Sequence, residues 1–232
     1  MISDPSAAPQ AMTWIRRSLS SSVGKKYVMA VTGLLLVGFL IAHLAGNLLI
    51  FTGEDGAAFD SYAHTLESNP LLPLAEIGLG LLFVVHIAMA LRVSLQNRDA
   101  RAQGYAVRAN LGRKTIASGS MLVTGLVVLL FLLVHLYDFR VGKLLHDPPP
   151  SSLAGLVRDR LAAPLGAGIY LVGVAALALH LRHAFRSAFQ SLGANHPHLN
   201  PALEKAGIGL AIILGLGFAS FPIVFLVAGA AP

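Results

Sequence analysis

The sequence contains no cysteine, a single tryptophan and few charged residues. Without cysteine, this chain cannot ligate an iron–sulfur cluster, form disulfides or attach a c-type haem covalently. Only 12% of its 232 residues are charged, whereas 55% are hydrophobic, and a soluble domain would need many more charged side chains to cover its surface. The composition therefore predicts an integral membrane protein, and the length fits one polytopic unit.

Five apolar segments are long enough to cross a hydrocarbon core of roughly 30 Å, which requires about 20 helical residues. They cover residues 27–51, 71–95, 115–137, 164–188 and 206–228. The first is too long for the apolar region of a signal peptide and predicts a retained helix. We therefore expect an all-α protein with a polar cytoplasmic segment at 1–25, containing a surface helix or a disordered tail around 12–19, and a five-helix transmembrane domain at 26–232.

Basic residues indicate how the spans are oriented. If the N-terminus lies in the cytoplasm, every Lys and Arg falls in an inner segment except Arg140, Lys143, Arg158 and Arg160. The first outer loop, residues 52–70, has no Lys or Arg and is acidic. The positive-inside rule therefore predicts a cytoplasmic N-terminus and an outer C-terminus. The net charge of +6 then reflects topology and contact with anionic membrane lipid, with no nucleic-acid partner required.

Four of the nine histidines lie inside apolar spans, one in each of the first four spans: His43, His86, His135 and His180. Ionisable side chains are costly within a membrane and are usually functional there. A single such histidine is more often a hydrogen-bonded packing residue. One histidine in each of four helices indicates a shared function instead.

The depth of these histidines follows from the helical rise of about 1.5 Å per residue. His43 lies 17 residues beyond Lys26, and His135 lies 21 residues beyond Lys114. Both are therefore placed roughly 25–30 Å from the inner face. The first and third spans thus contribute an outer pair of histidines.

The other two histidines belong near the inner face. His86 precedes Arg92 by six residues and His180 precedes Arg182 by two, so both lie within about 10 Å of that face. In a square four-helix bundle, alternate helices face each other across a diagonal, which lets two imidazoles approach one iron from opposite sides. The spacing predicts that spans one to four form a four-helix bundle around two b-type haems, each with two histidine ligands.

A buried haem also needs room for its flat macrocycle and partners for its propionates. Glycines within the spans would provide the room, although small residues between membrane helices are common packing positions too. These glycines are Gly33, Gly38, Gly46, Gly78, Gly80, Gly125, Gly166, Gly168 and Gly173. Candidate propionate partners are Lys25, Lys26, Arg92 and Arg182 on the inner side, and Arg140 and Lys143 on the outer side. All six are equally explained as interfacial anchors.

Several stretches of the chain resemble a known family. The first span carries Ser22-Val-Gly-Lys-Lys-Tyr-Val-Met-Ala-Val-Thr-Gly33 and His43-Leu-Ala-Gly-Asn47, and Tyr62-Ala63 follow in the next connection. The fourth span carries His180-Leu-Arg-His183-Ala-Phe-Arg-Ser-Ala-Phe-Gln-Ser-Leu-Gly193. These motifs resemble the cytochrome b membrane-anchor subunit of succinate dehydrogenase and fumarate reductase, in its single-subunit, five-helix, di-haem type. The resemblance runs from about residue 20 into the fifth span.

The resemblance implies that the outer histidine pair ligates a distal haem and the inner pair a proximal haem. It also implies a bacterial inner-membrane complex, in which a flavoprotein with covalent FAD and an iron–sulfur subunit dock on the cytoplasmic face and carry out the dicarboxylate chemistry. Ala184 stands where members of the family often have glycine. This difference makes His183 a poor ligand candidate and leaves the ligand assignment intact.

The membrane substrate implied by the resemblance is a quinone, with menaquinone expected for the di-haem type. Quinone reduction takes up protons, so the site needs acids or hydrated groups nearby. Glu76 in the second span and Glu67 at its outer start are candidates for an outer site, and Glu76 also fits an interfacial residue. An inner site near the iron–sulfur partner is the alternative. Some fumarate reductases of this type use a glutamate just before the fourth-helix ligand, but residues 177–179 are apolar here.

Two other functions stay open on the sequence. A quinone-reactive cytochrome b of a hydrogenase or formate dehydrogenase would keep the haems, but the motif at residues 24–33 does not favour it. A proton-coupled transporter would use the histidines as a relay, but it would require paired intramembrane acids and broken helices related by an internal repeat, which we do not find. The chain is therefore expected to be the electron-transfer and quinone-binding subunit of an enzyme complex.

Overall fold

The computed structural model describes residues 21–99, 116–145 and 152–229, and every regular element within these ranges is helical. Five helices are long and apolar enough to cross a membrane, as the sequence predicts. They are α2 (Ser22–Leu48, extended by the turn η1, Leu49–Phe51), α4 (Leu72–Asp99), α5 (Ile116–Leu136, continued by the π-helical turn η3, Tyr137–Val141, and by α6, Gly142–Leu145), α8 (Pro164–Ser191) and α9 (Asn200–Gly229). The helix or tail expected around residues 12–19 lies outside the described residues.

Helix starts depend on capping groups that hydropathy does not report. The side chain of Ser21 accepts a hydrogen bond from the Gly24 N–H at 3.0 Å and caps α2, so the helix begins at Ser22 rather than at residue 27. Pro164 occupies the first turn of α8, where the N–H that proline lacks is not needed. A polar first turn therefore extends α2 beyond the apolar segment that defines its predicted span, whereas α8 begins at the predicted residue.

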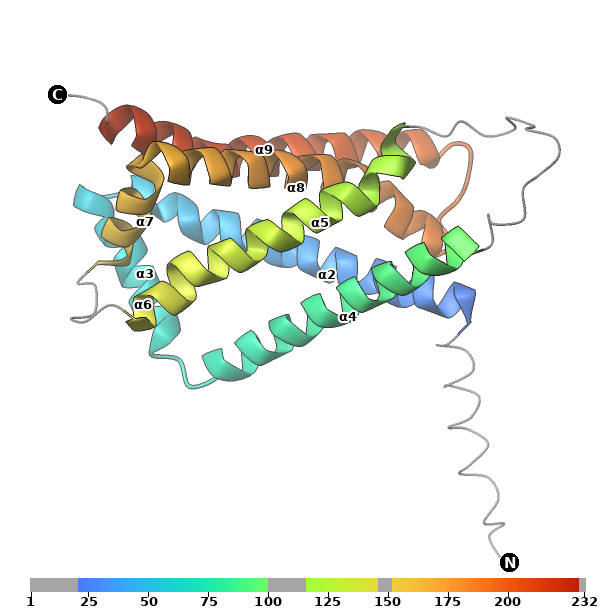
Figure 1. Ribbon diagram of the computed structural model, residues 1–232, viewed down its shortest axis with the longest axis horizontal. Coiled ribbons are helices and arrows are strands. Elements are labelled where there is room, and N and C mark those ends of the chain that lie inside the picture. Colours follow the sequence, from blue (N-terminus) through green and yellow to red (C-terminus); the bar gives the residue numbers. More distant parts are fainter. Residues whose placement is uncertain (1–20, 100–115, 146–151, 230–232) are drawn as a thin grey trace, which may run out of the picture.

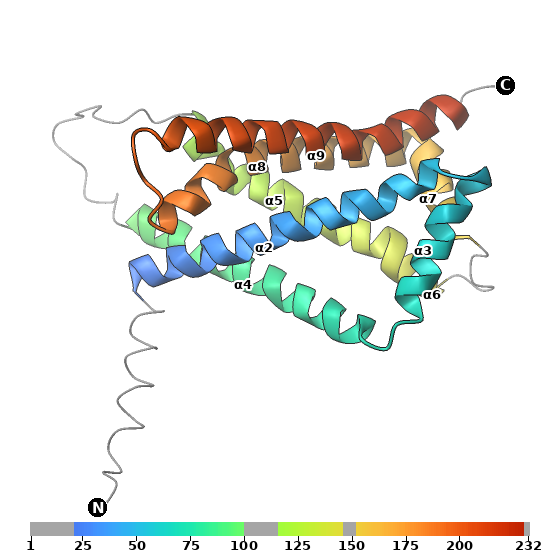
Figure 2. The same cartoon turned by 180° about the vertical axis from the view of Figure 1, so that it is seen from behind.

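Helix α8 is the most extensively packed of the five long helices. It contacts α9, α5 and α2, and α2 in turn packs against α4 (Figure 1). Helix α9 runs alongside α8 in both views (Figures 1 and 2). Helices α2 and α5 begin at one end of the molecule, here called the near end, and finish at the opposite, far end, whereas α4 and α8 run the other way. The first four long helices therefore alternate in direction.

Two short helices cover the far end, where the sequence analysis placed only connections: η2 (Glu54–Gly56) leads into α3 (Ala57–Glu67), and α7 (Leu153–Ala162) precedes α8. Phe59 of α3 is buried, as are Ala154, Val157 and Leu161 of α7, which recur every three or four residues. Both helices are shorter than the roughly 20 residues of a span, and tertiary packing rather than length stabilises them. A search for spans therefore does not detect them.

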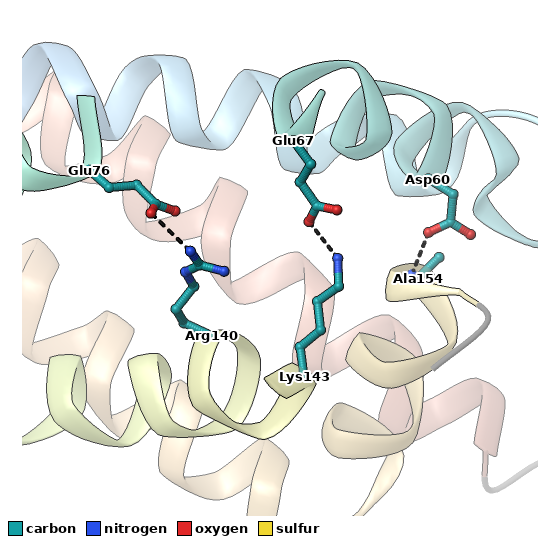
Figure 3. Close-up of polar contacts among 6 residues, drawn as sticks. All are labelled: Asp60, Glu67, Glu76, Arg140, Lys143 and Ala154. Carbon is teal, nitrogen blue, oxygen red and sulfur yellow. Dashed lines mark hydrogen bonds and ion pairs between the residues drawn. The ribbon is translucent and has the colours of Figure 1, made fainter. Parts of the chain in front are cut away.

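Asp60 joins α3 to α7. Its Oδ1 accepts a hydrogen bond from the Ala154 N–H at 2.9 Å (Figure 3), and its Oδ2 accepts one from the Ser152 hydroxyl at 2.7 Å. Ser152 Oγ itself accepts from the Gly155 N–H at 2.9 Å. The carboxylate thus caps α7 from another helix, at the terminus where the helix dipole favours a negative charge.

Removing this cap should destabilise the protein. Asp60→Ala leaves a part-buried N–H and a hydroxyl without their acceptor, and we expect a loss of about 1–3 kcal/mol in the free energy of unfolding. Thermal unfolding in detergent, followed by circular dichroism, measures the change. Asp159→Ala replaces an exposed acid of α7, the helix that Asp60 caps, and is the control. An equal loss in both variants would contradict the capping role.

Candidate functional site

His43 of α2 and His135 of α5 lie together toward the far end and are here called the far pair. Their ring centroids are 5.8 Å apart and their planes are nearly perpendicular, at 87°. Two imidazoles that bind one metal ion from opposite sides, through metal–nitrogen bonds of about 2 Å, have ring centroids about 6 Å apart. The far pair therefore has the spacing of two axial ligands of one metal ion.

Aromatic side chains from α2, α5, η3, α8 and α9 contact the far pair. They are Phe39, Phe131, Phe139, Tyr170 and Phe218. Nδ1 of His135 is buried among them, and no described residue offers it a hydrogen bond. Buried polar atoms are nearly always satisfied, and an unsatisfied one is unfavourable. An orphaned ring nitrogen in an apolar cage thus marks a place where a bound group would be stabilising.

His86 of α4 and His180 of α8 form a second, near pair and are close enough to interact electrostatically. Thr32 of α2 places its Oγ1 3.1 Å from Nδ1 of His86. Thr124 of α5 places its Oγ1 3.4 Å from Nδ1 of His180. A hydroxyl on a neighbouring helix therefore contacts the same nitrogen of each near-pair histidine.

The two pairs lie at different levels along the helices. Thr32 marks the level of His86 on α2, and His43 lies eleven residues further along that helix. Thr124 and His135 have the same separation on α5. At about 1.5 Å per residue, the two levels are about 16 Å apart. The structure thus brings together the same histidines that the depth estimate paired.

Each of the two levels offers two histidine side chains as donors. Among the described residues, no group of three or more His, Cys, Asp or Glu is gathered to hold an ion. Haem leaves only two axial positions for the protein, because the porphyrin supplies the other four ligands. Two histidines at each level are the number and the type of donor that a b-type haem requires.

The glycines of the spans divide into two groups. Of the nine glycines predicted to make room for a macrocycle, four face open space, because a Cβ added to any of them would have no neighbour within 4 Å outside its own turn: Gly38, Gly78, Gly80 and Gly168. Others lie against side chains, since a Cβ on Gly46 would lie 2.6 Å from the Tyr62 ring and one on Gly173 would overlap Phe131. Only the first group keeps the predicted role of making room beside a macrocycle; Gly46 and Gly173 instead permit close packing.

The basic residues predicted on the inner side all lie toward the near end. Lys25 and Lys26 are in the first turns of α2, and Arg92 lies late in α4. Arg182 follows His180 on α8 and is exposed. Their positions suit both predicted roles, as propionate partners and as interfacial anchors.

The acids and bases predicted on the outer side pair with each other at the far end (Figure 3). Arg140 donates to Glu76 at 2.9 Å, and Lys143 donates to Glu67. The two carboxylate side chains remain 41% and 44% exposed, so these ion pairs contribute little to stability. The candidate quinone acids and the candidate outer propionate partners are therefore engaged with one another.

Asp138 is a part-buried acid beside the far pair. It lies one residue beyond the end of the predicted span and was therefore not among the predicted site residues. Its side chain is only 10% exposed. Oδ2 accepts hydrogen bonds from Arg160 Nε at 2.8 Å and from the Tyr170 hydroxyl at 3.0 Å. Asp138 lies in η3, three residues after His135, and interacts with it electrostatically. An acid three residues after a candidate ligand lies on the same face of the helix. This spacing from His135 could have identified Asp138 in the sequence.

These observations give two histidine pairs about 16 Å apart along the helices, glycines that leave space, and a part-buried acid at the far pair. The arrangement comes from the chain's own residues and from how its helices pack. Comparison of the sequence and the structure with known proteins finds no matching family model, no matching curated protein and no matching solved structure.

Proposed function

We propose that the chain is the di-haem cytochrome b membrane anchor of a succinate:quinone oxidoreductase, acting in succinate oxidation or fumarate reduction. The observation that supports this most is the arrangement of four histidines in two pairs, one from α2 and α5 and one from α4 and α8. The motifs in α2 and α8 support the identity of the complex. Because the chain has no cysteine, both haems would be b-type, held without thioether bonds.

Each bound haem supplies a reversible one-electron carrier. His43 and His135 would hold the distal haem, and His86 and His180 the proximal one. The aromatic side chains around the far pair would exclude water from the distal site. The two levels, about 16 Å apart by helical rise, would let the chain carry electrons from one face of the membrane toward the other.

In this proposal the near end faces the bacterial cytoplasm and receives the soluble subunits. The positive-inside distribution of Lys and Arg supports that orientation. The partners are a flavoprotein with covalent FAD and an iron–sulfur subunit, and they must supply the clusters because this chain has no cysteine. Exposed basic residues at the near end, such as Lys26 and Arg92, are available to anionic lipid headgroups there.

We place the quinone, expected to be menaquinone, at the far end. Asp138 and Tyr170 are joined by a part-buried hydrogen bond beside the far pair and would carry protons there, whereas residues 177–179 before His180 offer no acid for a site near the inner haem. Electrons that reduce quinone outside move toward the positive side of the membrane and gain about 2.3 kcal/mol each per 100 mV. The membrane potential would thus assist reduction of a low-potential quinone.

The alternatives gain nothing from the structure. A transporter of the kind considered above needs broken helices at its site, whereas α4 and α8 are continuous through the histidines they carry. The hydrogenase and formate dehydrogenase cytochromes share the haem prediction but not the motif in α2. Neither alternative has an observation of its own in its favour.

Haem content of the purified full-length chain tests the proposal. The reduced-minus-oxidised spectrum should show b-type haem, and the pyridine haemochrome assay should approach two haems per chain. His64→Ala, which removes an exposed histidine of α3, should leave both values unchanged and is the control. A chain that holds no haem would exclude this proposal and the hydrogenase alternative together.

A further inference from the structure

Thr32 and Gly33 form a cradle for one near-pair histidine. Thr32 Oγ1 lies 3.1 Å from Nδ1 of His86. A Cβ added to Gly33 would lie 3.1 Å from Cε1 of the same ring, a tighter contact than almost any side chain makes. Nδ1 of the His86 imidazole thus contacts the Thr32 hydroxyl, and the adjacent Cε1 lies against Gly33. We call this the first cradle.

Thr124 and Gly125 form an equivalent, second cradle on α5. Thr124 Oγ1 lies 3.4 Å from Nδ1 of His180. A Cβ added to Gly125 would lie 3.4 Å from Cε1 of that ring. The same two residue types therefore meet the same two ring atoms in both halves of the near pair.

The hydrogen bonds within the cradles have a defined direction. The threonine hydroxyl of the first cradle donates to the main-chain oxygen of Val28 at 2.8 Å, and that of the second donates to Ser120 O at 3.0 Å. A hydroxyl has a single hydrogen, so with its own proton used in this way it can only accept from the imidazole. When the hydroxyl donates to its own helix in this way, the near-pair histidine that it contacts carries its proton on Nδ1.

Further main-chain carbonyls support the same direction. The Thr32 hydroxyl also lies 3.1 Å from the carbonyl oxygen of Met29, and the Thr124 hydroxyl lies 3.2 Å from that of Met121. A carbonyl oxygen only accepts, so each hydroxyl has two acceptors on its own helix for its single hydrogen. Protonation at Nδ1 leaves the lone pair of the neutral ring on Nε2, where a metal would be bound.

The cradles recur at a fixed distance from the far-pair histidines. Thr32-Gly33 and Thr124-Gly125 are each followed by nine residues and then by His43 or His135. This internal correspondence lies in residues that hydropathy and histidine depth do not single out. Each of α2 and α5 therefore supplies a far-pair ligand and, about 16 Å away, a support for a near-pair ligand.

We infer that Thr32-Gly33 and Thr124-Gly125 are paired positioning sites that fix the ring orientation and the Nδ1–H tautomer of the two near-pair histidines. The inference rests on the proposed function for the identity of the ligand, a b-type haem. A metal-bound histidine whose other nitrogen donates a hydrogen bond is a stronger donor and favours the oxidised metal. The cradle threonines therefore lower the reduction potential of the haem that the near pair would ligate.

The test uses the purified full-length chain with its haems. Thr32→Val and Thr124→Val keep the side-chain shape and remove the hydroxyl. Loss of a hydrogen bond to a metal-bound histidine changes metal affinity by about 10–100-fold. If losing the hydroxyl weakens the preference of His86 or His180 for ferric over ferrous haem tenfold, the reduction potential rises by about 59 mV. We expect this rise only in the haem that is lost in His86→Ala, and the potential of the other haem should not change. Thr32→Ser keeps a hydroxyl and should therefore keep the original potential.

Ser220→Ala is the matched control, because the Ser220 hydroxyl of α9 donates to the Gly217 carbonyl at 2.7 Å within its own helix. It should shift neither potential. If one valine variant does not accumulate, the other decides, because both cradles act on the same haem. Unchanged potentials in the valine variants, or equal shifts of both haems, would overturn the inference while leaving the proposed function standing.

A measurement without haem separates the two proposals further. Nitrogen NMR of the haem-free chain with labelled histidine should show His86 and His180 protonated at Nδ1, and Thr32→Val should change the tautomer population of His86 alone. Protonation of these rings at Nε2 would refute the cradles even if the chain binds two haems. A chain that binds no haem yet shows the Nδ1 tautomer would overturn the proposed function and keep the cradles.

Discussion

His135→Ala is expected to remove one of two haems and to leave the other at full occupancy. The far pair supplies both axial ligands of one haem in our proposal, so His43→Ala should cause the same loss. His86→Ala and His180→Ala should instead remove the second haem. The pyridine haemochrome value should fall by about half in every case, and the reduced-minus-oxidised spectrum should lose the same component within each pair.

The pairing, more than the loss itself, is the decisive result. His43 and His86 lie in neighbouring helices that pack against each other, so a packing argument based on adjacent helices would pair them. Loss of the same component in His43→Ala and His86→Ala would therefore contradict the arrangement across the four helices. His64→Ala again serves as the control for a general effect of losing a histidine.

Asp138→Asn is expected to slow quinone reduction by about 100-fold or more, since a positioned acid contributes roughly 10²–10⁴-fold to proton transfer. The amide keeps the shape of the side chain and cannot carry the proton. Succinate oxidation by the assembled complex with an artificial dye, which takes electrons from the soluble subunits, should not change. Tyr170→Phe removes only the hydroxyl that donates to Asp138 and should give a smaller loss.

Two comparisons make this prediction specific. Asp159→Asn changes an exposed acid of α7 and should leave quinone reduction unchanged. Glu76→Gln tests the acid chosen from the sequence, which is paired with Arg140 at the surface. Slow turnover in Glu76→Gln with normal turnover in Asp138→Asn would contradict the prediction and would assign proton transfer to Glu76 of α4. If Asp138→Asn loses haem because Arg160 is left unpaired, the rate of quinone reduction in Tyr170→Phe becomes the test of the prediction.

The spans and the histidine levels could be predicted because they depend on properties local to the sequence. Hydropathy over about 20 residues reports a span, and the distance from a histidine to the nearest basic residues reports its depth. Thus His43 and His135 could be paired by counting. The ring contact in the structure joins the same two residues.

Contacts between residues far apart in the sequence could not be predicted from local hydropathy or from distances along a helix. The short helix α7 is stabilised by burial of Val157 and Leu161 and by a cap from Asp60 of another helix, and none of these is visible in local hydropathy. Asp138 entered the far site through η3, which continues α5 past the predicted end of the span. Thr32 resembled an ordinary hydroxyl bonded to its own helix, and only the packing of α4 against α2 gives it a partner on another helix.

The origin of each histidine pair has a consequence for the order in which the protein is made. Each pair joins one residue from the α2–α4 half of the chain to one from the α5–α8 half. During synthesis the far pair is complete once α5 has been inserted, whereas the near pair must wait for α8. In a chain with the proposed function, the haem farther from the cytoplasm could therefore be bound first, and the second haem would lock α4 to the last helix of the four to emerge.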